Sequence, residues 1–432
     1  MKQFVSKIWN SPSARNVGKL LSANVFAQAL GLLVYPILTR MYSPEDFGLL
    51  NWFISIGGVF ALLGTLDYFN AIVLPKTDQE ARGIVHVSLM SIVIVTFLLL
   101  LTIPFAAPIS TLLKSPRLTP YYWLLPVYVF LVSLWNVLNY WYIRHKEYGR
   151  ISGYQMSQSL FSSGYKISFG AIGWLQGGLL LSTVLAPFCS LLVSICLSMR
   201  KHFRFLMTWD GEACRNAAIK YINFPKYSAP RSLLNYISGN LPTLMLTPVF
   251  GLTELGYVGM AFTLAFYPVR IIVQSVYQVF YQQVTEMVNR QQTIFGLLVR
   301  YVGWTMAVSA PLLIILYAIL PWLTAWLLGD SWRITGDYIR LLLPWIIMVF
   351  LNTSINFIPD IFGKQRILLG MEICYLIFRI LSLLIGIQAE SIILALKLFS
   401  ISGVIVLLVE LVWFMSLARK HDKQYEHTNT IK

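Results

Sequence analysis

The sequence is poor in charge and in cysteine. Of its 432 residues, 12% are Asp, Glu, Lys or Arg, about half of the 25% that is usual in soluble proteins. Because 57% of the residues are hydrophobic and the mean hydropathy is +0.67, the composition excludes an ordinary soluble enzyme. The four cysteines show neither the spacing of metal ligands nor a disulfide framework, and we expect them to be packing residues: Cys189, Cys196, Cys214 and Cys374.

Several chemical motifs are also missing. The chain has no Gly-rich loop ending in Lys-Ser or Lys-Thr, so we expect no ATP-driven step within it. Its five histidines show no metal-ligand spacing, and no nucleophile motif with a plausible base is present. The sequence therefore predicts a protein that is not an enzyme, with no catalytic residue, no metal site and no cofactor.

The hydrophobic residues gather in long runs separated by short polar connections. A transmembrane helix needs about 20 mainly apolar residues, and the runs lack the alternation of strands in a membrane barrel. We therefore predict an all-α integral membrane protein with twelve transmembrane helices. Their approximate ranges are 18–39, 47–69, 84–106, 121–143, 151–172, 175–199, 227–250, 255–281, 297–320, 336–358, 367–388 and 391–417.

The basic residues alternate between the connections. The termini and every second connection hold 23 of the 33 Lys and Arg residues, whereas the other connections hold only Arg40, Lys114, Arg117 and Arg333. Because cytoplasmic loops are enriched in Lys and Arg, this pattern predicts a multi-pass protein with both termini in the cytoplasm. The net charge of +15 follows from this topology, and we expect no nucleic-acid partner.

The predicted helices divide into two halves of six. We expect an N-terminal lobe at 1–199, a cytoplasmic basic linker at 200–226, and a C-terminal lobe with a polar tail at 227–432. An acidic residue precedes a glycine by two positions in Asp46-Phe47-Gly48 and again, 208 residues later, in Glu254-Leu255-Gly256. Duplicated halves are common in transporters and place the substrate site at their interface. The spacing therefore predicts two pseudo-symmetric lobes.

Short segments in order along the chain carry a family resemblance. These segments are Thr39–Gly48, Ala71–Lys76, Gln278–Tyr281, Leu328–Arg333, Gly336–Tyr338, Leu343–Trp345 and Phe362–Arg366. Together they resemble the polysaccharide transporters, the Wzx-like O-antigen flippases, of the multidrug/oligosaccharidyl-lipid/polysaccharide flippase superfamily. The resemblance implies a MATE- and MurJ-like fold that moves undecaprenyl-diphosphate-linked sugar repeat units across the bacterial inner membrane for lipopolysaccharide O-antigen or another surface polysaccharide. Membrane lipids and the polysaccharide polymerase machinery are the other partners that we expect.

Nine of the acidic and basic residues in the predicted helices are candidates for function, because a charge there is costly unless it faces protein or water. Three are acidic: Asp67, Glu372 and Glu410. Six are basic: Lys166, Arg231, Arg270, Arg340, Arg379 and Lys397. Pairing among these residues leaves a surplus of positive charge, for which an anionic ligand such as a lipid-linked diphosphate is the natural partner.

Depth in the membrane separates the basic residues. Arg270 and Arg379 lie near the middle of their helices, where snorkelling to either surface is hardest, and we predict that they bind the head group. Lys166 and Arg231 lie nearer helix ends and are further candidates, which either bind substrate or contact the membrane surface. We expect the remaining two basic residues to be anchors near the outer interface.

The acidic residues and Arg40 are candidates for a gate or for ion coupling. Arg40 ends the first predicted helix and is placed to pair with Glu45 or Asp46 at an outer gate. Without an ATP motif, transport requires an ion gradient or disposal of the substrate, and H⁺ and Na⁺ are the candidate ions. The candidate coupling residues, for which plain salt bridges are the alternative, are Asp67, Glu372 and Glu410.

Two other functions suit a membrane chain of this kind. A multidrug or cation antiporter of the same superfamily should offer acids and aromatic residues in its cavity, and the surplus of basic residues argues against it. A polysaccharide polymerase has a large outer loop with basic catalytic residues, whereas the longest predicted outer loop here has only about 15 residues.

Overall fold

The computed structural model describes the backbone of residues 12–430, and within this range it contains no β-strand. Side chains are described at all of these positions except 12–24, 197–205, 207, 267, 268, 270–272, 274, 275, 278, 279, 282, 310, 312 and 425–430. The predicted all-α fold class is therefore confirmed.

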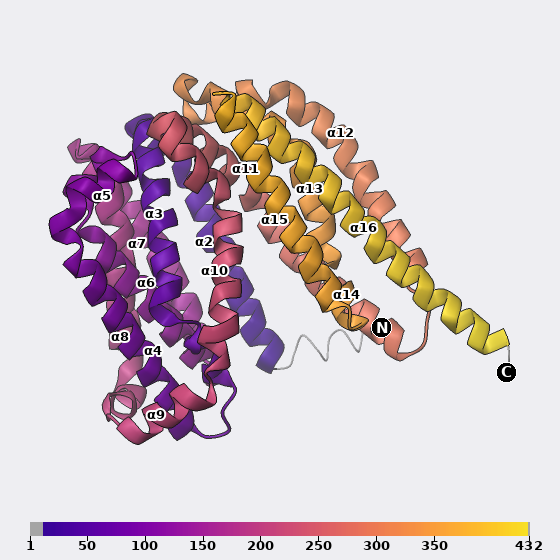
Figure 1. Cartoon of the computed structure of the whole chain (residues 1–432), viewed down its shortest axis with the longest axis horizontal. Helices are drawn as coiled ribbons and strands as arrows, with labels where there is room; N and C mark the ends of the chain where they lie inside the picture. The colour runs from indigo at the N-terminus through magenta and orange to yellow at the C-terminus, as the bar shows by residue number, and fades with distance from the viewer. Residues whose placement is uncertain (1–11, 431–432) are drawn as a thin grey trace. The chain divides into compact units, whose positions relative to one another are not determined.

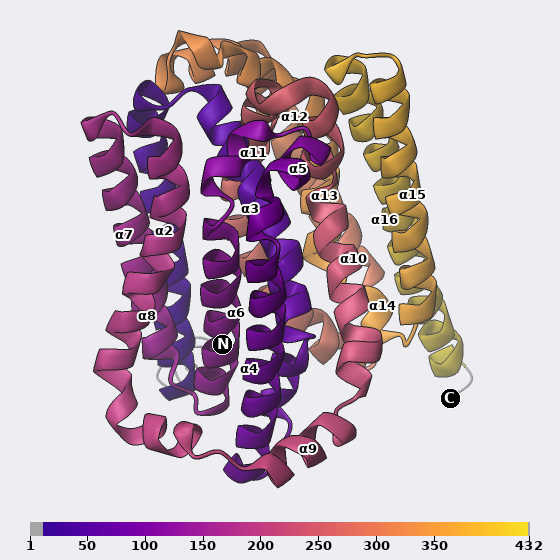
Figure 2. The ribbon, with the colours of Figure 1, turned by 60° about the vertical axis from the view of Figure 1, so that its left-hand side comes forward.

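Contacts group the chain into two compact units, Met1–Gly256 and Tyr257–Lys432. In the first unit, long helices run side by side (Figure 1 and Figure 2). Its α-helices are α2 (Pro12–Met41), α3 (Pro44–Thr65), α4 (Asp78–Leu101), α5 (Ala106–Leu112), α6 (Leu124–Arg144), α7 (Tyr148–Ile172), α8 (Leu175–Met207), α9 (Gly211–Lys220) and α10 (Ala229–Gly239). Short helical turns connect some of them: η1 (Tyr68–Val73), η2 (Ile103–Phe105), η3 (Pro116–Tyr121) and η4 (Phe224–Ser228).

Helix α11 (Leu241–Asn289) begins in the first unit and continues into the second. It is interrupted at Gly251, whose φ of 84° lies in the left-handed region that favours glycine. The second unit also contains η5 (Asp330–Trp332), α12 (Phe295–Leu328), α13 (Arg333–Ile355), α14 (Ile358–Ile361), α15 (Gln365–Gln388) and α16 (Ile392–Thr430). Within this unit α15 packs on α16, and α13 packs on both α12 and α16.

Many of these helices suit a membrane. Among the described residues, eight helices are long and apolar enough to cross one, and the bent α12 adds a ninth. Each of the twelve predicted ranges overlaps a helix of the structure. Helix α7 is long enough but rich in Ser, Gly and Gln, and the count of twelve spans stays a prediction.

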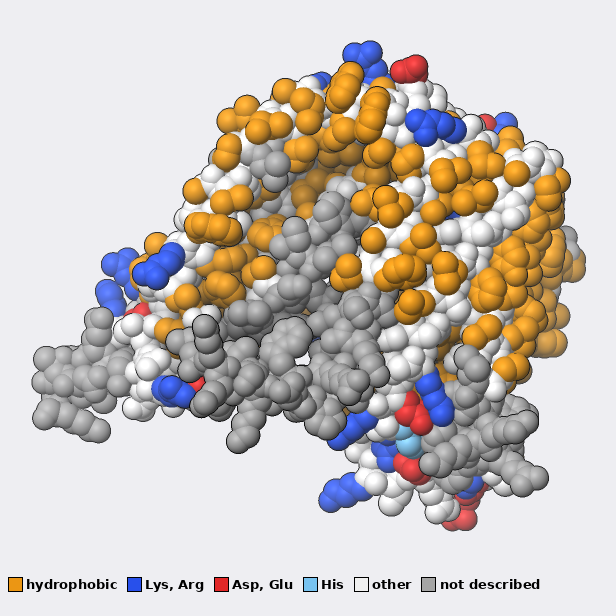
Figure 3. All heavy atoms as spheres, turned by 180° about the vertical axis from the view of Figure 1, so that it is seen from behind, with side chains coloured by type: hydrophobic (Ala, Val, Ile, Leu, Met, Phe, Trp, Pro, Cys, Tyr) orange, Lys and Arg blue, Asp and Glu red, His pale blue; other side chains and the backbone are white. Residues whose placement is uncertain are grey.

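The outer surface of the helices is apolar. Figure 3 shows hydrophobic side chains over most of the described surface on one face, with Lys and Arg mainly toward its ends. Phe97, Ile314 and Ile405 are 58%, 73% and 57% exposed. Soluble monomers rarely expose contiguous apolar patches larger than a few hundred Å². The exposed apolar surface therefore faces lipid, and the protein is a multi-pass membrane protein.

The predicted linker at 200–226 is largely helical. Helix α8 extends into it, and α9 lies against the start of α4, where Arg82 and Asp210 form an ion pair of 3.2 Å. The backbone N–H of Ala213 donates to Asp210 at the start of α9 and lowers the pKa of that carboxyl below its usual value. Contacts group α10 with the first unit, and the division into lobes on either side of the linker stays a prediction.

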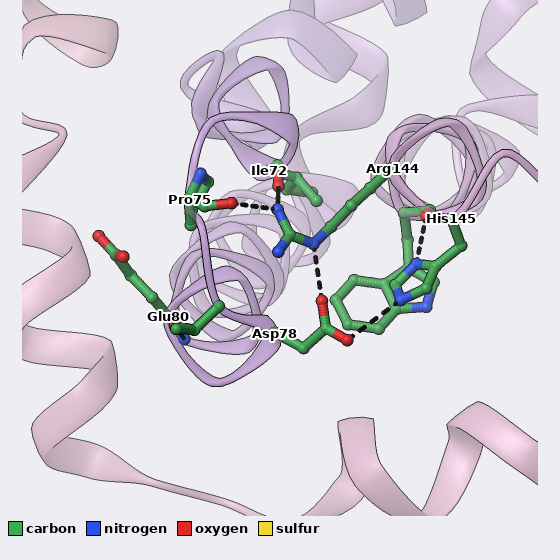
Figure 4. A network of polar contacts seen from close by, with 8 residues as sticks. Ile72, Pro75, Asp78, Glu80, Arg144 and His145 are labelled. Atoms are coloured by element: carbon green, nitrogen blue, oxygen red, sulfur yellow. Dashed lines mark hydrogen bonds and ion pairs between the residues drawn. The ribbon is translucent and has the colours of Figure 1, made fainter.

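Arg144, at the end of α6, holds the loop between η1 and α4 (Figure 4). Its guanidinium donates to the carbonyl oxygens of Ile72 and Pro75 at 3.2 and 2.7 Å, and to Oδ1 of Asp78 at 2.9 Å. His145 lies 3.5 Å from the other carboxylate oxygen of Asp78. The Arg144 side chain is only 11% exposed whereas Asp78 is 54% exposed, so the hydrogen bonds to the two carbonyls are the ones sheltered from water, and they give the loop a fixed shape.

Arg144→Ala should lower the free energy of unfolding by about 1.5–3 kcal/mol, because two carbonyl oxygens lose a charged donor. The shift in the unfolding midpoint of the purified protein in detergent measures this change. Arg290→Ala is the matched control, since its ion pair with Glu286 is exposed and such pairs contribute about 0.5 kcal/mol or less. Equal destabilisation by the two variants would contradict the role assigned to Arg144.

Candidate functional site

Asp67 is the most buried acidic residue described inside a predicted helix. It follows α3, is 1% exposed and has a positive φ of 58°. The hydroxyls of Ser228 and Ser232 donate to its Oδ2 at 2.7 and 2.6 Å. Ser228 and Ser232 are four residues apart, which places both on one face at the start of α10. No Lys or Arg lies within 4.0 Å of this carboxylate among the side chains that the structure describes.

Polar contacts continue along the same pair of helices. The hydroxyl of Tyr236 on α10 donates to the carbonyl oxygen of Ile54 on α3 at 3.1 Å. The hydroxyl of Ser55 donates to Oδ1 of Asn240 at 3.4 Å. We call these contacts, together with the Asp67 contacts, the α3–α10 seam. Hydrogen bonds thus join the two helices at the end of α3 and near its middle.

Arg379 on α15 lies among aromatic rings of the second unit. Its guanidinium carbon is 3.9 Å from the ring centroid of Tyr375, 5.4 Å from that of Trp345 and 5.2 Å from that of Phe399. Nη2 of Arg379 donates to the hydroxyl of Tyr375 at 2.7 Å, and Nε1 of Trp345 donates to the same oxygen at 2.6 Å. A cation over an aromatic face gains about 0.5–2 kcal/mol. These four residues, the Arg379 cluster, hold a positive charge in a defined orientation.

Two acidic candidates lie in the same region of the second unit. Glu410 on α16 is 6% exposed and lies within electrostatic range of Glu372 and Arg379. Glu372 and Arg379 are seven residues apart on α15 and share a helix face. The structure therefore brings together three residues that the sequence assigns to head-group binding and ion coupling.

The remaining candidate site residues differ in exposure. Lys166 on α7 is half-buried, and Arg231 in the first turn of α10 is exposed. Arg40 at the end of α2 is exposed and donates to the carbonyl oxygen of Pro36 at 3.1 Å. The side chain of Arg270 lies outside the described residues.

The acids at the start of α3 have partners of their own. Glu45 forms an ion pair of 2.7 Å with Arg117. Oδ2 of Asp46 accepts from the backbone N–H of Ser43 at 2.9 Å, and the N–H of Asp46 donates to the Ser43 hydroxyl at 3.3 Å. This reciprocal capping box fixes the first turn of α3. Pairing of Arg40 with either acid stays a prediction.

Arg340, which we expect from the sequence to be a membrane anchor, has a structural role. Pro321 has no N–H to donate to the carbonyl of Tyr317, and Nε of Arg340 donates to that oxygen instead. Its Nη2 donates to the carbonyl of Ala318 at 2.8 Å, and its Nη1 to Asp337 at 3.1 Å. Arg340 therefore provides the donor that Pro321 cannot provide to the Tyr317 carbonyl, and its role as a membrane anchor stays a prediction.

Sequence reasoning missed the side chains that hold the charged residues. Tyr375 precedes Arg379 by four residues, a spacing that puts both on one helix face, so this neighbour is visible in the sequence. Ser228 and Ser232 show the same spacing, but Asp67 is 161 residues away from Ser228. Only the fold brings those three together.

The fold defined by these helices is that of a class of membrane carriers, the MATE transporters. An outward-facing multidrug resistance MATE family transporter of the MOP superfamily aligns over 96% of this chain and 98% of its own, with a TM-score of 0.58 and 12% identity. A MATE structure in complex with MaL6 aligns over 96% and 99%, with a TM-score of 0.59 and 13% identity. A MOP superfamily transporter from Pyrococcus furiosus, described by the reverse polarity of its binding pocket, aligns over 96% and 98%, with a TM-score of 0.53 and 12% identity.

The chain belongs to the polysaccharide biosynthesis protein family, whose model matches residues 37–335. The succinoglycan biosynthesis transport protein ExoT of Rhizobium meliloti (strain 1021) is 21% identical over 331 residues, which cover 76% of this chain and 65% of that protein. The chain thus spans just under two thirds of the length of that relative. The resemblance to polysaccharide transporters is confirmed, and the protein combines a polysaccharide biosynthesis family with a transporter fold.

Tyr375→Phe keeps the ring beneath Arg379 and removes the hydroxyl that accepts from Arg379 and Trp345. We expect the free energy of unfolding in detergent to fall by about 1–3 kcal/mol, because two donors lose their acceptor. Tyr317→Phe is the control: its ring lies 5.2 Å from the Arg340 guanidinium, the residue is 59% exposed, and stability should not change. An unchanged free energy of unfolding in Tyr375→Phe would show that this hydroxyl does not hold the Arg379 cluster together.

Proposed function

We propose that the protein is a flippase for undecaprenyl-diphosphate-linked oligosaccharide repeat units in the bacterial inner membrane. It acts by alternating access, in the synthesis of O-antigen or another surface polysaccharide, with both termini in the cytoplasm. The unaided barrier is the transfer of a charged, polar head group through hydrocarbon. A wet pathway between the two repeats removes this barrier while the prenyl tail stays in lipid. Family membership and the transporter fold support this function.

The proposal depends most on the guanidinium of Arg379, a residue of α15. It lies 3.9 Å from the ring of Tyr375 within a helix of 24 mainly apolar residues. The aromatic faces lower the free-energy penalty of the charge and orient its planar fork. A guanidinium fork binds two phosphate oxygens at once. A diphosphate is therefore the ligand that this arrangement suits.

Other basic residues contribute positive charge along the proposed pathway. Arg270 and Lys166 are assigned to the head-group site, and the exposed Arg231 to the first contact with the head group. The nine candidate residues in the predicted helices are six basic and three acidic residues, which favours an anionic substrate. A multidrug or cation antiporter, the second candidate, is expected to show the opposite balance. Overexpression that leaves drug susceptibility unchanged would discard this candidate.

The proposed carrier uses an ion gradient and makes no covalent bond. Asp67, Glu372 and Glu410 are assigned to coupling with H⁺ or Na⁺, and Arg40 to a gate. Asp67 is the strongest of these candidates, because two hydroxyls and no described cationic side chain hold its carboxylate. Binding of H⁺ or Na⁺ there changes the local charge in a site of low polarity, where such a change has a large effect. The strength of the α3–α10 seam then depends on the ion.

Deletion of the gene should abolish surface polysaccharide in a strain that has no second flippase, and should leave lipid-linked repeat units in the inner leaflet. The wild-type gene should restore both. Arg379→Ala should restore export to less than about a tenth of the wild-type level, because a hydrogen bond to a charged group contributes about 1.5–3 kcal/mol. Surface polysaccharide and the leaflet position of the lipid-linked sugar are the measured quantities.

Lys397→Ala is the matched control for this experiment. Lys397 is an exposed basic residue of α16, and its variant should complement fully at equal membrane levels. Equal loss in both variants would remove Arg379 from the site. Surface polysaccharide that persists in the deletion strain would refute the flippase, and single repeat units that accumulate on the outer leaflet would indicate a polymerase.

Asp67→Asn keeps a side chain that can bond both serine hydroxyls but removes the charge that would bind H⁺ or Na⁺. Export should fall about tenfold or more, which corresponds to ~1.4 kcal/mol, and should no longer respond to an imposed pH or Na⁺ gradient in reconstituted vesicles. Glu286→Gln is the control, since the ion pair of Glu286 with Arg290 is exposed. Gradient-driven export at the wild-type rate in Asp67→Asn would exclude Asp67 from coupling.

A further inference from the structure

Two glycines bring the start of α3 and the break in α11 into backbone contact. A Cβ on Gly48 would overlap the carbonyl oxygen of Leu252 and lie 2.6 Å from its carbonyl carbon. A Cβ on Gly256 would overlap the carbonyl oxygen of Pro44 and lie 2.6 Å from its carbonyl carbon. Side chains do not approach backbone atoms so closely, and only glycine fits at either position. Both segments belong to the first compact unit.

The two contacts are equivalent, because they join corresponding residues of the two segments. Leu252 follows Pro44 by 208 residues, and Gly256 follows Gly48 by the same 208 residues. Each segment therefore presents its glycine to the backbone carbonyl of the equivalent residue in the other. A reciprocal contact of this kind requires a local two-fold axis between the segments, as at the self-complementary interface of a symmetric dimer.

We propose that this reciprocal glycine contact is the closed gate at the end of the pathway where α3 begins. The proposal rests on the carrier function proposed above. In carriers built from parallel repeats, the axis that relates the repeats runs along the membrane normal, and the substrate site lies at their interface. A backbone contact on that axis closes the pathway at its end of the membrane, and it must separate before a head group passes.

The surroundings of the gate keep its two backbones in position. On the α3 side, the capping box of Ser43 and Asp46 fixes the first turn, and the ion pair of Glu45 with Arg117 holds the same turn to η3. On the α11 side, the left-handed conformation of Gly251 begins the turn that presents the Leu252 carbonyl. The glycine contact itself is made by backbone atoms.

The labelling rate of a cysteine thiol placed at the gate measures the opening of the gate. In a protein whose four native cysteines are replaced by Ser, Leu252→Cys is labelled with a membrane-impermeant maleimide, and we expect slow labelling because Leu252 is 8% exposed. Gly48→Ala and Gly256→Ala should each raise the labelling rate several-fold and to the same extent. The double variant should label no faster than either one, because the first added Cβ already separates the segments.

Gly164→Ala is the matched control, because a Cβ on this glycine of α7 would meet nothing within 4 Å. It should leave the labelling rate unchanged. The gate proposal is wrong if Gly48→Ala leaves the labelling rate unchanged. It is also wrong if Gly48→Ala raises the labelling rate and Gly256→Ala does not raise it equally.

A second measurement does not require the alanine variants to fold. Glu45→Cys and Thr253→Cys, again 208 residues apart, are joined across the contact by a flexible bis-maleimide. The cross-linked protein should export nothing, whereas each single-cysteine variant should export at the same rate with and without the reagent. Export by fully cross-linked protein would equally overturn the gate.

Failure of the gate and failure of the proposed function are distinguishable. If lipid-linked sugars are not the substrate, the deletion strain keeps its surface polysaccharide, but the labelling response of Gly48→Ala and Gly256→Ala remains, since it reports the contact alone. If the contact is not a gate, the deletion strain still loses polysaccharide, but the cross-linked protein exports normally.

Discussion

The free-energy penalty of placing a charge in hydrocarbon is the constraint on which the rest of this structure depends. The protein meets it in a different way at each site. Asp67 accepts from two serine hydroxyls, Arg379 lies against the ring of Tyr375, and Arg340 binds the carbonyl that Pro321 leaves without a donor. Each arrangement also fixes the orientation of the charged side chain, and a charged side chain of fixed orientation can bind a ligand selectively.

Helix α3 shows how the same constraint decides which helices stay together. Between helices surrounded by lipid, apolar contact offers little driving force, and hydrogen bonds with close backbone packing provide it instead. Along α3 these contacts are Asp67 at one end, Ile54 near the middle and Gly48 at the other. The contacts of α3 with α10 and α11 at these separate points can be released in sequence, which suits the proposed alternating access.

The second unit contains residues proposed for recognition and residues proposed for coupling in one region. Glu410 on α16 lies within electrostatic range of both Arg379 and Glu372 on α15. In the proposed mechanism, an anion bound to Arg379 competes with Glu410 for the same positive charge. Substrate binding thereby alters the affinity of Glu410 for H⁺ or Na⁺, and one guanidinium serves both tasks.

The sequence by itself determined the class of protein, because hydrophobic run length, alternating basic connections and ordered family segments are properties of local composition. It also placed Arg379 in the middle of a helix. Tertiary structure alone decided the partners: Asp67 meets serines 161 and 165 residues later, Gly48 meets a backbone beyond the midpoint of the chain, and Arg340 donates to the Tyr317 carbonyl. The sequence determines how many charged residues lie in the membrane and need a partner. The tertiary structure decides which group lies close enough to be that partner.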